Sequence, residues 1–420
     1  MPSRRLRAMP GVAAACAALL AACAVLLAGC WSAPRPAPEP TPLRPDWRAV
    51  TLPTPPGAPG RLLLRDAAAC GGRWFVVGAV ADAAGATRPA AWSSTDGVSW
   101  SALPVRGESF YGRQHVLYAV ACRDGRIAAL GAKNGGVHGN PRTGTWVQRP
   151  DGSVREVLAG FELFGGQRAV AAGRLAAGPG GWLIAGARVD GAAVWTSPDA
   201  SRFAILEGAP ELAGDGRGRT AAYDAVAGSS GWLVVGSLLP AGGAALAPLA
   251  WTSADGQAWR RAELPTPDGR GRAQRVVLLD GEPVAVGPVR DGFAAWRPAA
   301  AESVGELSPS GPPTEPGRAA QWRRVGGFGA AGPGVLSVVG LAVVGRRLVA
   351  VTGDGAGRRL WASADGGVSW RAVTVPGPAA VPDSGDTAVA VAGGEERLLL
   401  LADDGGSSRA WWAVPPWIDR

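Results

Sequence analysis

The sequence has 420 residues and carries 42 lysines and arginines against 34 aspartates and glutamates, a net charge of +8 at pH 7. No block of like charges and no basic helical pattern accompanies this modest excess, which argues against a nucleic-acid-binding protein. Beyond the first 30 residues no apolar stretch approaches the roughly 20 residues that a membrane-spanning helix needs.

The first 29 residues have the pattern of an export signal. Three arginines among the first seven residues precede an apolar run from Gly11 to Leu27, as in secretory signal peptides. The run ends in Leu26-Leu-Ala-Gly-Cys30, which resembles the bacterial lipobox. This resemblance implies that residues 1–29 are removed and that Cys30 carries a lipid such as palmitate. The mature protein is then expected on the extracytoplasmic side of the cell membrane, anchored by that lipid.

The lipidated cysteine is followed by a proline-rich segment that reaches residue 45. Six of residues 31–45 are proline, a composition that favours extended polyproline II structure. We therefore expect residues 30–45 to be a tether that has no core to join and is poorly ordered.

From residue 46 to residue 420 one order of four short strands recurs. A small-residue strand, such as Ala67–Ala69, is followed by an apolar strand that usually ends in glycine, by a strand that contains tryptophan and by a short return strand. The tryptophans of the third strand recur at intervals of 45 to 65 residues: Trp92, Trp146, Trp195, Trp251, Trp296, Trp361 and Trp411. A period near 50 residues with four strands per repeat predicts an all-β fold, a seven-bladed β-propeller of four-stranded blades.

The two ends of the repeat region complement each other. The seventh repeat has no clear fourth strand, whereas residues 46–53 (Asp-Trp-Arg-Ala-Val-Thr-Leu-Pro) closely match the fourth strand of repeat six, residues 369–376. We expect residues 46–53 to complete blade seven and close the ring, because closure removes exposed sheet edges. Blade five has an insertion, Pro298 to Ala320, expected to be a mobile outer loop.

The turn between the third and fourth strands resembles the Asp box, or BNR repeat, of sialidase-like propellers. Ser363, Asp365, Gly367, Ser369 and Trp370 match its pattern Ser-x-Asp-x-Gly-x-Ser/Thr-Trp. Variants of the box occur in three further repeats, so its aspartates are Asp96, Asp199, Asp255 and Asp365. In this family the box is structural and lies far from the active site. We expect each carboxylate to accept backbone N–H groups of its own turn.

The same resemblance raises the alternative of a sialidase-like glycoside hydrolase. Such an enzyme needs an arginine triad, a tyrosine nucleophile paired with glutamate and an aspartate that acts as acid and base. The family's early Arg-Ile-Pro element is missing, and no tyrosine has an obvious glutamate partner in the sequence. Non-catalytic binding is therefore the favoured function. A further alternative, an envelope assembly factor, comes from a resemblance to photosystem-assembly propellers.

Candidate ligand-binding residues precede the first strand of several blades. Connections from one blade to the next share a face with the loops between second and third strands, so we expect these residues around the mouth of the central channel. The candidates are Arg65, Arg113, Arg168, Arg219, Arg272, Tyr111, His115 and His138. Such a site suits an anionic glycan, a small molecule or an envelope protein.

The remaining cysteines and histidines favour no cofactor. Cys70 and Cys122 occupy similar positions in two successive repeats, and they form a disulfide only if their strands approach closely enough. Two cysteines and two histidines in dissimilar loops give no metal pattern. We expect a monomer without metal or cofactor, and membrane attachment only through Cys30.

Overall fold

The computed structural model describes residues 40–135, 141–299 and 321–414. The chain divides into two compact units, Met1–Thr41 and Pro42–Arg420, and the account below concerns the second. The predicted signal, Cys30, His138 and residues 300–320 of the insertion lie outside the described residues.

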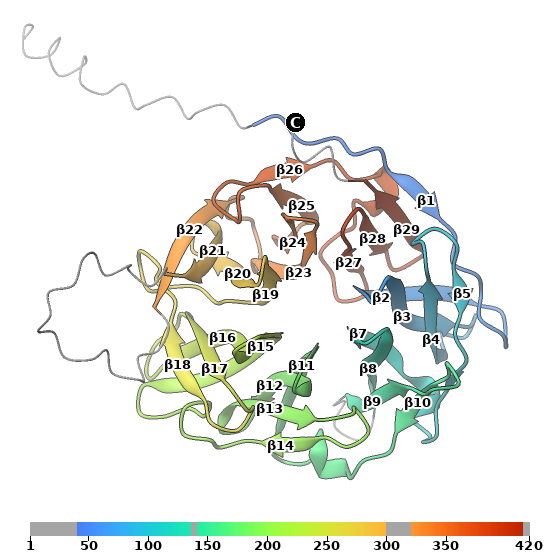
Figure 1. Cartoon of the computed structure of the whole chain (residues 1–420), viewed down its shortest axis with the longest axis horizontal. Helices are drawn as coiled ribbons and strands as arrows, with labels where there is room; N and C mark the ends of the chain where they lie inside the picture. Colours follow the sequence, from blue (N-terminus) through green and yellow to red (C-terminus); the bar gives the residue numbers. More distant parts are fainter. Residues whose placement is uncertain (1–39, 136–140, 300–320, 415–420) are drawn as a thin grey trace, which may run out of the picture. The chain divides into compact units, whose positions relative to one another are not determined.

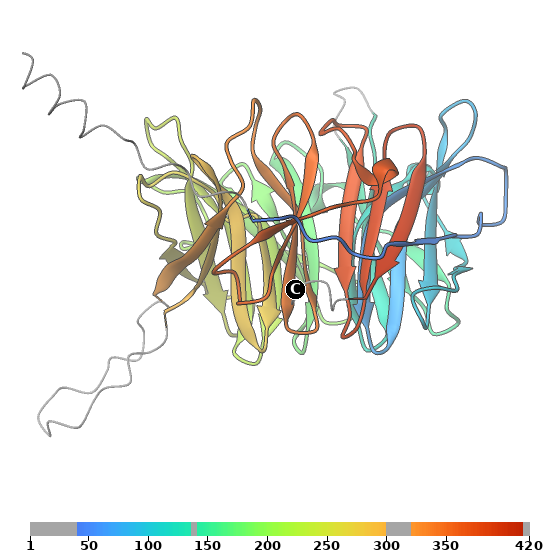
Figure 2. The ribbon, with the colours of Figure 1, turned by 90° about the horizontal axis from the view of Figure 1, so that it is seen from above.

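Seven sheets, the blades, stand in a ring (Figure 1), which confirms the predicted seven-bladed β-propeller. Figure 2 shows that the strands run across the ring, between its two loop-bearing faces. From the inside outward, blades 1 to 3 consist of β2 (Arg61–Cys70), β3 (Arg73–Ala81), β4 (Thr87–Ser94) and β5 (Ser101–Ala102); β7 (Val116–Arg123), β8 (Arg126–Lys133), β9 (Arg142–Gln148), β10 (Val154–Val157) and β6 (Val105–Arg106); and β11 (Ala169–Gly178), β12 (Gly181–Arg188), β13 (Gly191–Ser197) and β14 (Ala204–Leu206).

The remaining four blades keep the same order of strands. They consist of β15 (Gly218–Gly228), β16 (Gly231–Pro240), β17 (Ala247–Ser253) and β18 (Arg260–Glu263); β19 (Arg275–Leu279), β20 (Glu282–Val289), β21 (Gly292–Pro298) and β22 (Trp322–Phe328); β23 (Ser337–Val344), β24 (Arg347–Gly353), β25 (Arg358–Ser363) and β26 (Arg371–Val373); and β27 (Ala388–Gly393), β28 (Leu398–Asp403), β29 (Ser408–Ala413) and β1 (Arg48–Val50). Each innermost strand contacts the innermost strands of both neighbouring blades.

Two details differ from the expected blade. Blade 2 has five strands, because β6, in the connection from blade 1, pairs in parallel with β10 through Val105 and Arg106. The innermost strands are also longer than expected: β2 spans Arg61–Cys70 rather than Ala67–Ala69. Arg65 and Arg219 therefore lie within strands and not in the connections that precede them.

The ring closes as predicted between the two ends of the repeat region. In β1, Ala49 pairs with Trp411 of β29, so β1 is the outer strand of blade 7. The expectation that the tether through residue 45 has no core to join is wrong for Leu43. Leu43 is only 4% exposed, and its backbone exchanges two hydrogen bonds of 2.8 Å with Ala372 and Thr374 of blade 6. An apolar side chain beside an unpaired outer strand explains this docking.

The hydrophobic core lies between neighbouring blades, and an apolar cluster fills each junction of the ring. The third-strand tryptophans occupy these junctions, and five of them are almost completely buried. Four of those five donate their indole N–H to a backbone oxygen in the connection that enters the blade, at Pro53, Leu163, Glu211 and Pro265. Each tryptophan thus fixes the loop that leads into its own blade.

Each of the four predicted Asp-box carboxylates bonds within its own turn. Asp96 accepts the backbone N–H groups of Val98 at 2.8 Å and Ser99 at 2.7 Å. Asp255 and Asp365 do the same, and Asp199 accepts the N–H of Ser201 at 2.8 Å. In the turn of Asp199, Ala200 takes the left-handed conformation (φ 61°) that glycine takes in the other copies. These hydrogen bonds lower the pKa of Asp96.

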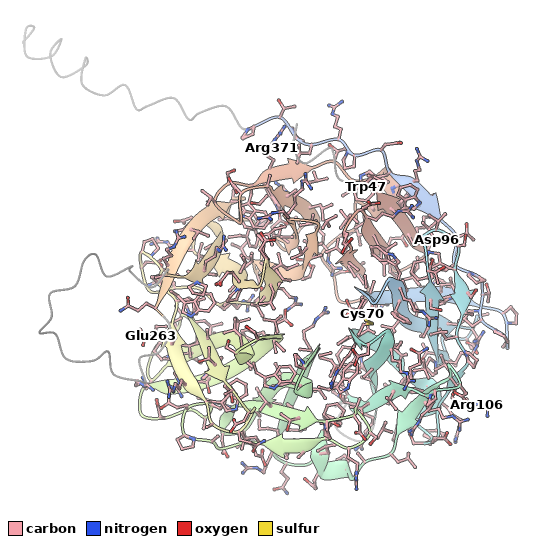
Figure 3. All side chains as sticks on the ribbon, in the orientation of Figure 1. Trp47, Cys70, Asp96, Arg106, Glu263 and Arg371 are labelled. Carbon is pink, nitrogen blue, oxygen red and sulfur yellow. A yellow bond between two sulfur atoms is a disulfide. The ribbon has the colours of Figure 1, made fainter. Side chains whose placement is uncertain are left out.

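A disulfide joins the innermost strands of blades 1 and 2. Cys70 and Cys122 have their Cα atoms 5.9 Å apart, within the range that a disulfide spans. Figure 3 shows Cys70 near the centre of the ring, where neighbouring blades converge. This convergence brings the two cysteines close enough to bond, which the sequence alone did not decide.

In the described part of the chain, no helix has the length and apolar character needed to cross a membrane.

Candidate functional site

Four charged residues surround the ring axis at one level. Each lies 12 residues before the glycine of the second strand in its blade (Gly78, Gly186, Gly236 and Gly287), and each pairs with the residue that precedes this glycine. We call them the axial charges: Asp66, Arg174, Asp224 and Arg275. In blades 1, 3 and 4 a β-bulge directly precedes the axial charge, and bulges commonly redirect side chains.

The axial charges are engaged with one another and with neighbouring strands. Asp66 accepts the backbone N–H of Val120 in blade 2 at 2.9 Å and a hydrogen bond from Arg174 at 3.2 Å. Asp224 accepts the N–H of Val276 in blade 5 at 3.2 Å and its other oxygen accepts the N–H of Ala225. These carboxylates fix one blade against the next.

Burial and mutual attraction shift the pKa values of this group. Burial raises the pKa of Asp224, and Arg275 and Arg174 oppose that shift. Burial and the nearby Arg174 lower the pKa of Arg275 to about 10, against the attraction of Asp224 and Asp66. For Arg174, burial acts to lower the pKa, but the carboxylates of Asp66 and Asp224 raise it overall. Two carboxylates and two guanidinium groups therefore form a charge-balanced cluster.

The two tyrosines near the axial charges are also engaged. Tyr118 donates its hydroxyl hydrogen to the backbone oxygen of Ala172 at 3.0 Å, and burial raises its pKa. The Tyr223 hydroxyl lies 2.7 Å from the Ser237 hydroxyl. A raised pKa opposes ionisation, so Tyr118 is poorly suited to act as a nucleophile.

Most of the predicted arginines have partners within the protein. Arg65 pairs with the fully buried Asp403 of blade 7. Arg168 pairs with Asp190 and Glu207. The Arg272 guanidinium, whose pKa is lowered by burial, donates to the backbone oxygen of Leu336 at 2.6 Å.

Arg113 and Arg219 remain exposed. Arg113 donates to the backbone oxygen of Glu108 at 2.9 Å, whereas Arg219 has no hydrogen-bond or ion-pair partner among the described residues. The five arginines therefore differ greatly in how free they are to bind an anion.

Tyr111 and His115 line a cavity between the loops of blades 1, 2 and 3, whereas His138 is outside the described residues. Tyr111 and His115 flank the 3-10 helix η1 (Gly112–Gln114) in the connection from blade 1 to blade 2. Arg142 begins β9, and Phe161 begins the 3-10 helix η2 (Phe161–Leu163) in the connection to blade 3. The cavity has a volume of about 250 Å³. We call it the Arg142 pocket, lined by Ser109, Tyr111, His115, Arg142, Glu156 and Phe161.

Glu156 of β10 holds the loop that carries Tyr111. Its carboxylate, on a residue only 8% exposed, accepts the backbone N–H groups of Glu108 and Ser109, both at 2.7 Å, and the Ser109 hydroxyl at 2.6 Å. A Cβ at Gly112 would lie 1.8 Å from a Glu156 oxygen, so a larger residue there would displace the Glu156 carboxylate from this position. Glu156 is thus a positioning residue whose oxygens already have donors.

His115 is also a positioning residue. It is 2% exposed, and its Nδ1 accepts the indole N–H of Trp146 at 3.2 Å. In blade 2 this nitrogen takes the place of the backbone oxygen that four other tryptophans use. Burial lowers the pKa of His115, against the opposing charge of Glu156 and a backbone hydrogen bond with Arg142. The imidazole is therefore neutral at physiological pH and links η1 to the start of β9.

Arg142 is the cation of the pocket. Its guanidinium carbon lies 4.8 Å from the centre of the Phe161 ring and 5.5 Å from that of Tyr111. Its Nε is buried without a hydrogen-bond partner, and no carboxylate of the described chain forms an ion pair with it. Residues 136–140, which directly precede this strand region, have the sequence Gly-Val-His-Gly-Asn and contain no acid. Arg142 is thus held by two aromatic rings and has no counter-ion among the described residues.

The sequence placed Tyr111 and His115 among the candidate ligand-binding residues, but Glu156 and Phe161 were missed. Glu156 lies two residues after the completely buried Val154 in the same short strand, and both side chains are on the buried face. A glutamate on the buried face of a strand is a signal that could have been read, because buried carboxylates need partners. Nothing in the sequence marks Phe161 as the neighbour of Arg142.

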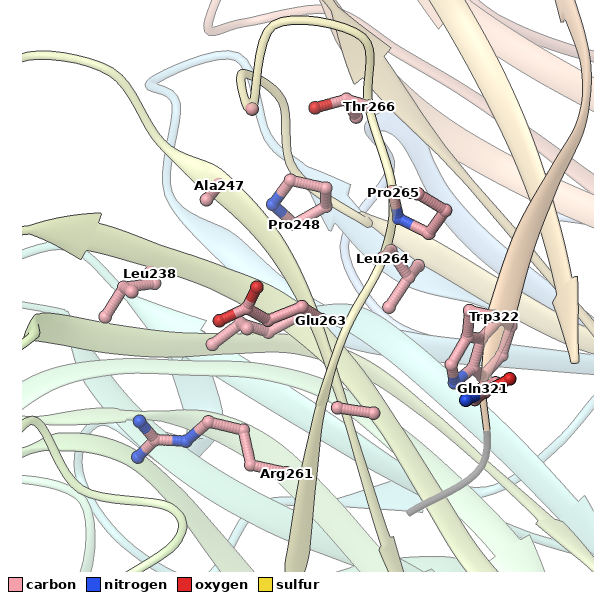
Figure 4. Close-up of a pocket in the computed structure, with 13 residues that line it drawn as sticks. Leu238, Ala247, Pro248, Arg261, Glu263, Leu264, Pro265, Thr266, Gln321 and Trp322 are labelled. Carbon is pink, nitrogen blue, oxygen red and sulfur yellow. The ribbon is translucent and has the colours of Figure 1, made fainter. Parts of the chain in front are cut away.

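A second cavity, of about 630 Å³, lies at the outer strands of blades 4 and 5 (Figure 4). Leu264, Pro265 and Trp322 contribute apolar surface to it, and Arg261 is paired with Asp215 at 3.1 Å. Gln321, which also lines this cavity, directly follows residues 300–320, which are outside the described residues, so we assign no ligand to it. The described ranges contain no cluster of three or more histidine, cysteine, aspartate or glutamate side chains placed to hold a metal ion.

No family model and no curated protein matches the sequence. Among solved structures, the extracellular domain of the hybrid two-component system BT4673 from B. thetaiotaomicron is similar, with 10% identity, a TM-score of 0.49, and 87% of this chain and 39% of that chain covered. A second similar structure is a puromycin-hydrolyzing peptidase of Mycobacterium tuberculosis, with 11% identity, a TM-score of 0.48, and 81% of this chain and 49% of that chain covered. A third is a Trypanosoma rangeli sialidase with 2,3-difluorosialic acid, with 11% identity, a TM-score of 0.42, and 90% of this chain and 60% of that chain covered. The chain thus spans 39 to 60% of the length of these proteins. Likeness at this level carries no argument about activity.

Proposed function

We propose that this propeller is a non-catalytic binding module of the cell envelope, anchored by lipid on Cys30, and that its ligand-binding surface is the Arg142 pocket. The observation that carries the proposal is the convergence of three separate loops on a guanidinium group that has no counter-ion in the part of the chain that the structure describes. Propeller loops held by a rigid ring suit recognition, because little ordering is needed on binding.

The absence of catalysis is supported by the state of the acidic and phenolic groups at the ring axis. A glycosidase needs one carboxylic acid and one carboxylate or tyrosinate free to reach the substrate. Burial raises the pKa of Asp224, as in a general acid, but both of its oxygens accept backbone N–H groups. Asp66 accepts the backbone N–H of Val120 and a hydrogen bond from Arg174, and Tyr118 donates its hydroxyl hydrogen to the backbone oxygen of Ala172.

The extracytoplasmic location is supported by two independent features. The basic and apolar start of the chain ends in a lipobox-like sequence at Cys30, and Cys70 and Cys122 are bonded to each other. Disulfides persist mainly outside the reducing cytoplasm. A Cys30→Ser variant should lose the acyl group, detected by mass spectrometry, and leave the membrane fraction, whereas retention of both acyl group and membrane association would contradict the anchor.

The binding proposal is tested with the full chain in detergent. A panel of fluorogenic glycosides that includes a sialoside should release no product, whereas acidic envelope glycans should raise the melting temperature. Product release would identify a glycoside hydrolase. Binding of no glycan, together with recovery of a defined envelope protein complex, would favour the assembly-factor alternative.

A further inference from the structure

Arg142 forms no ion pair with Glu156, the carboxylate that lines the same pocket, or with any other carboxylate of the described residues. The guanidinium is in contact with two aromatic rings, which attract a cation through their faces but do not neutralise it. A partly buried cation without an anion is unfavourable. The carboxylate of Glu156 uses its oxygens to accept hydrogen bonds from three donors of residues 108–109. The charged donors of the pocket that remain for a ligand therefore belong to Arg142.

The geometry of a guanidinium group favours one kind of anion. Its planar arrangement of N–H groups matches the two oxygens of a carboxylate. The rings of Phe161 and Tyr111 restrict the orientation of this plane, so little side-chain freedom remains to be lost when a ligand binds. An arginine on a flexible surface loop would lack this preorganisation.

The size and rim of the pocket restrict the rest of the ligand. Its volume of about 250 Å³ is below the roughly 300–1,000 Å³ of sites that enclose drug-sized molecules, so it admits a single small ring. Phe161 is 58% exposed, and Leu158, which also lines the pocket, is 68% exposed. Exposed apolar groups of this kind at a concave site favour contact with the flat face of a ring.

We infer that the Arg142 pocket recognises a carboxylate carried on a single ring, such as a terminal sugar acid of an envelope glycan. This inference rests on the proposed binding function and gives it a ligand class. The carboxylate is bound by the Arg142 guanidinium, and the ring lies against Phe161. His115 and Glu156 are positioning residues that hold Arg142 and Tyr111 in place.

The test is calorimetric titration of the full chain in detergent with glucuronate, N-acetylneuraminate, benzoate and glucose. Glucuronate or N-acetylneuraminate should bind, and glucose, which lacks a carboxylate, should bind at least tenfold more weakly. Benzoate distinguishes an aromatic acid from a sugar acid as the source of the carboxylate. Tighter binding of benzoate than of both sugar acids would keep the carboxylate assignment and overturn the sugar assignment.

Variants connect the binding to the pocket. Arg142→Gln should weaken binding of the acid at least tenfold, and Arg142→Lys should restore only part of it, because lysine lacks the planar pair of donors. Phe161→Leu should weaken binding several-fold. The matched control is Arg323→Gln, which removes an exposed arginine of β22 outside the pocket and should change the affinity less than twofold. Arg219→Gln tests the competing candidate arginine and should leave the binding in place.

The outcomes separate the inference from the proposed function. If wild type and Arg142→Gln have similar melting temperatures and bind the acid equally, the inference is overturned. It is also overturned if Arg219→Gln loses the binding instead. If the wild type binds neutral glycans but no acid, the binding function stands and the ligand class is wrong. Cleavage of any ligand would overturn the proposed function itself.

Discussion

Asp66 of blade 1 accepts a hydrogen bond of 3.2 Å from Arg174 of blade 3, although blade 2 lies between them in the ring. The same carboxylate accepts the backbone N–H of Val120 in blade 2. One side chain therefore ties three successive blades together at the ring axis. Asp224 extends the pattern to blade 5 through the N–H of Val276.

Removal of the Asp66 carboxylate should destabilise the ring. The Asp66 side chain is 3% exposed and that of Arg174 is 27% exposed, so Asp66→Ala leaves a poorly solvated cation and an unpaired N–H group. We expect a loss on the order of 3 kcal/mol in the free energy of unfolding, measured by guanidinium denaturation. The control Asp291→Ala, at a side chain that is 89% exposed, should change it by less than about 0.5 kcal/mol.

A double variant tests whether the effect comes from the pair. Asp66→Leu with Arg174→Met removes both charges, and it should be more stable than Asp66→Leu alone, because no unpaired cation remains. Strictly additive losses would contradict a direct interaction between these two residues.

Deletion of residues 40–53 should open the ring. The deletion removes β1 and the buried Leu52, which is 7% exposed, and a leucine of this kind contributes about 1.5–3 kcal/mol. It also exposes the edge of β29, and exposed edges promote association. Denaturation midpoints and light scattering should show a less stable protein that self-associates. A monomer with the wild-type midpoint would contradict closure by β1.

Stability should fall below neutral pH because of His115. Its pKa in the folded protein is below the ordinary value of 6.5, so as the pH falls through about 6.5 the unfolded chain binds a proton that the folded state does not. The free energy of unfolding then decreases by up to about 1.4 kcal/mol per pH unit until the pH reaches the lowered pKa. His115→Asn lacks this titration, so denaturation midpoints between pH 7.5 and 5 should fall more for the wild type. Parallel curves would contradict a buried neutral imidazole.

The disulfide should stabilise blades 1 and 2. Cys70 and Cys122 are separated by 52 residues, and closing a loop of this length stabilises a protein by on the order of 4 kcal/mol in the chain-entropy model. A Cys70→Ala and Cys122→Ala double variant should unfold at a lower denaturant concentration. Wild type treated with a reducing agent should behave like that variant. The bond would be contradicted if the untreated wild type already had Cys70 and Cys122 as free thiols and reduction did not change its unfolding.

The architecture could be predicted from the sequence because its determinants are local and repeated. Seven tryptophans mark the third strands, and the likeness of residues 46–53 to residues 369–376 predicts how β1 closes the ring. The short strand β6 could not be predicted, since its pairing with β10 depends on where a connection lies in space. Leu43 was assigned to the tether because it lies within a proline-rich segment, and a single leucine there gives no sign that it packs against blade 6.

The candidate site was predicted less completely. Counting arginines placed Arg65 and Arg168 among the ligand-binding residues, but their carboxylate partners Asp403, Asp190 and Glu207 come from distant positions that only the fold reveals. The same holds for Arg142, whose importance depends on two rings from different loops and on the absence of a counter-ion within the described residues.

The central claim is that the Arg142 pocket binds an acid, and a crystal structure of the full chain with glucuronate tests it most directly. We predict that the carboxylate lies within hydrogen-bond distance of the Arg142 guanidinium and that the sugar ring lies against Phe161. Glucuronate bound at the ring axis or beside Arg219, with the Arg142 pocket empty, would contradict the account.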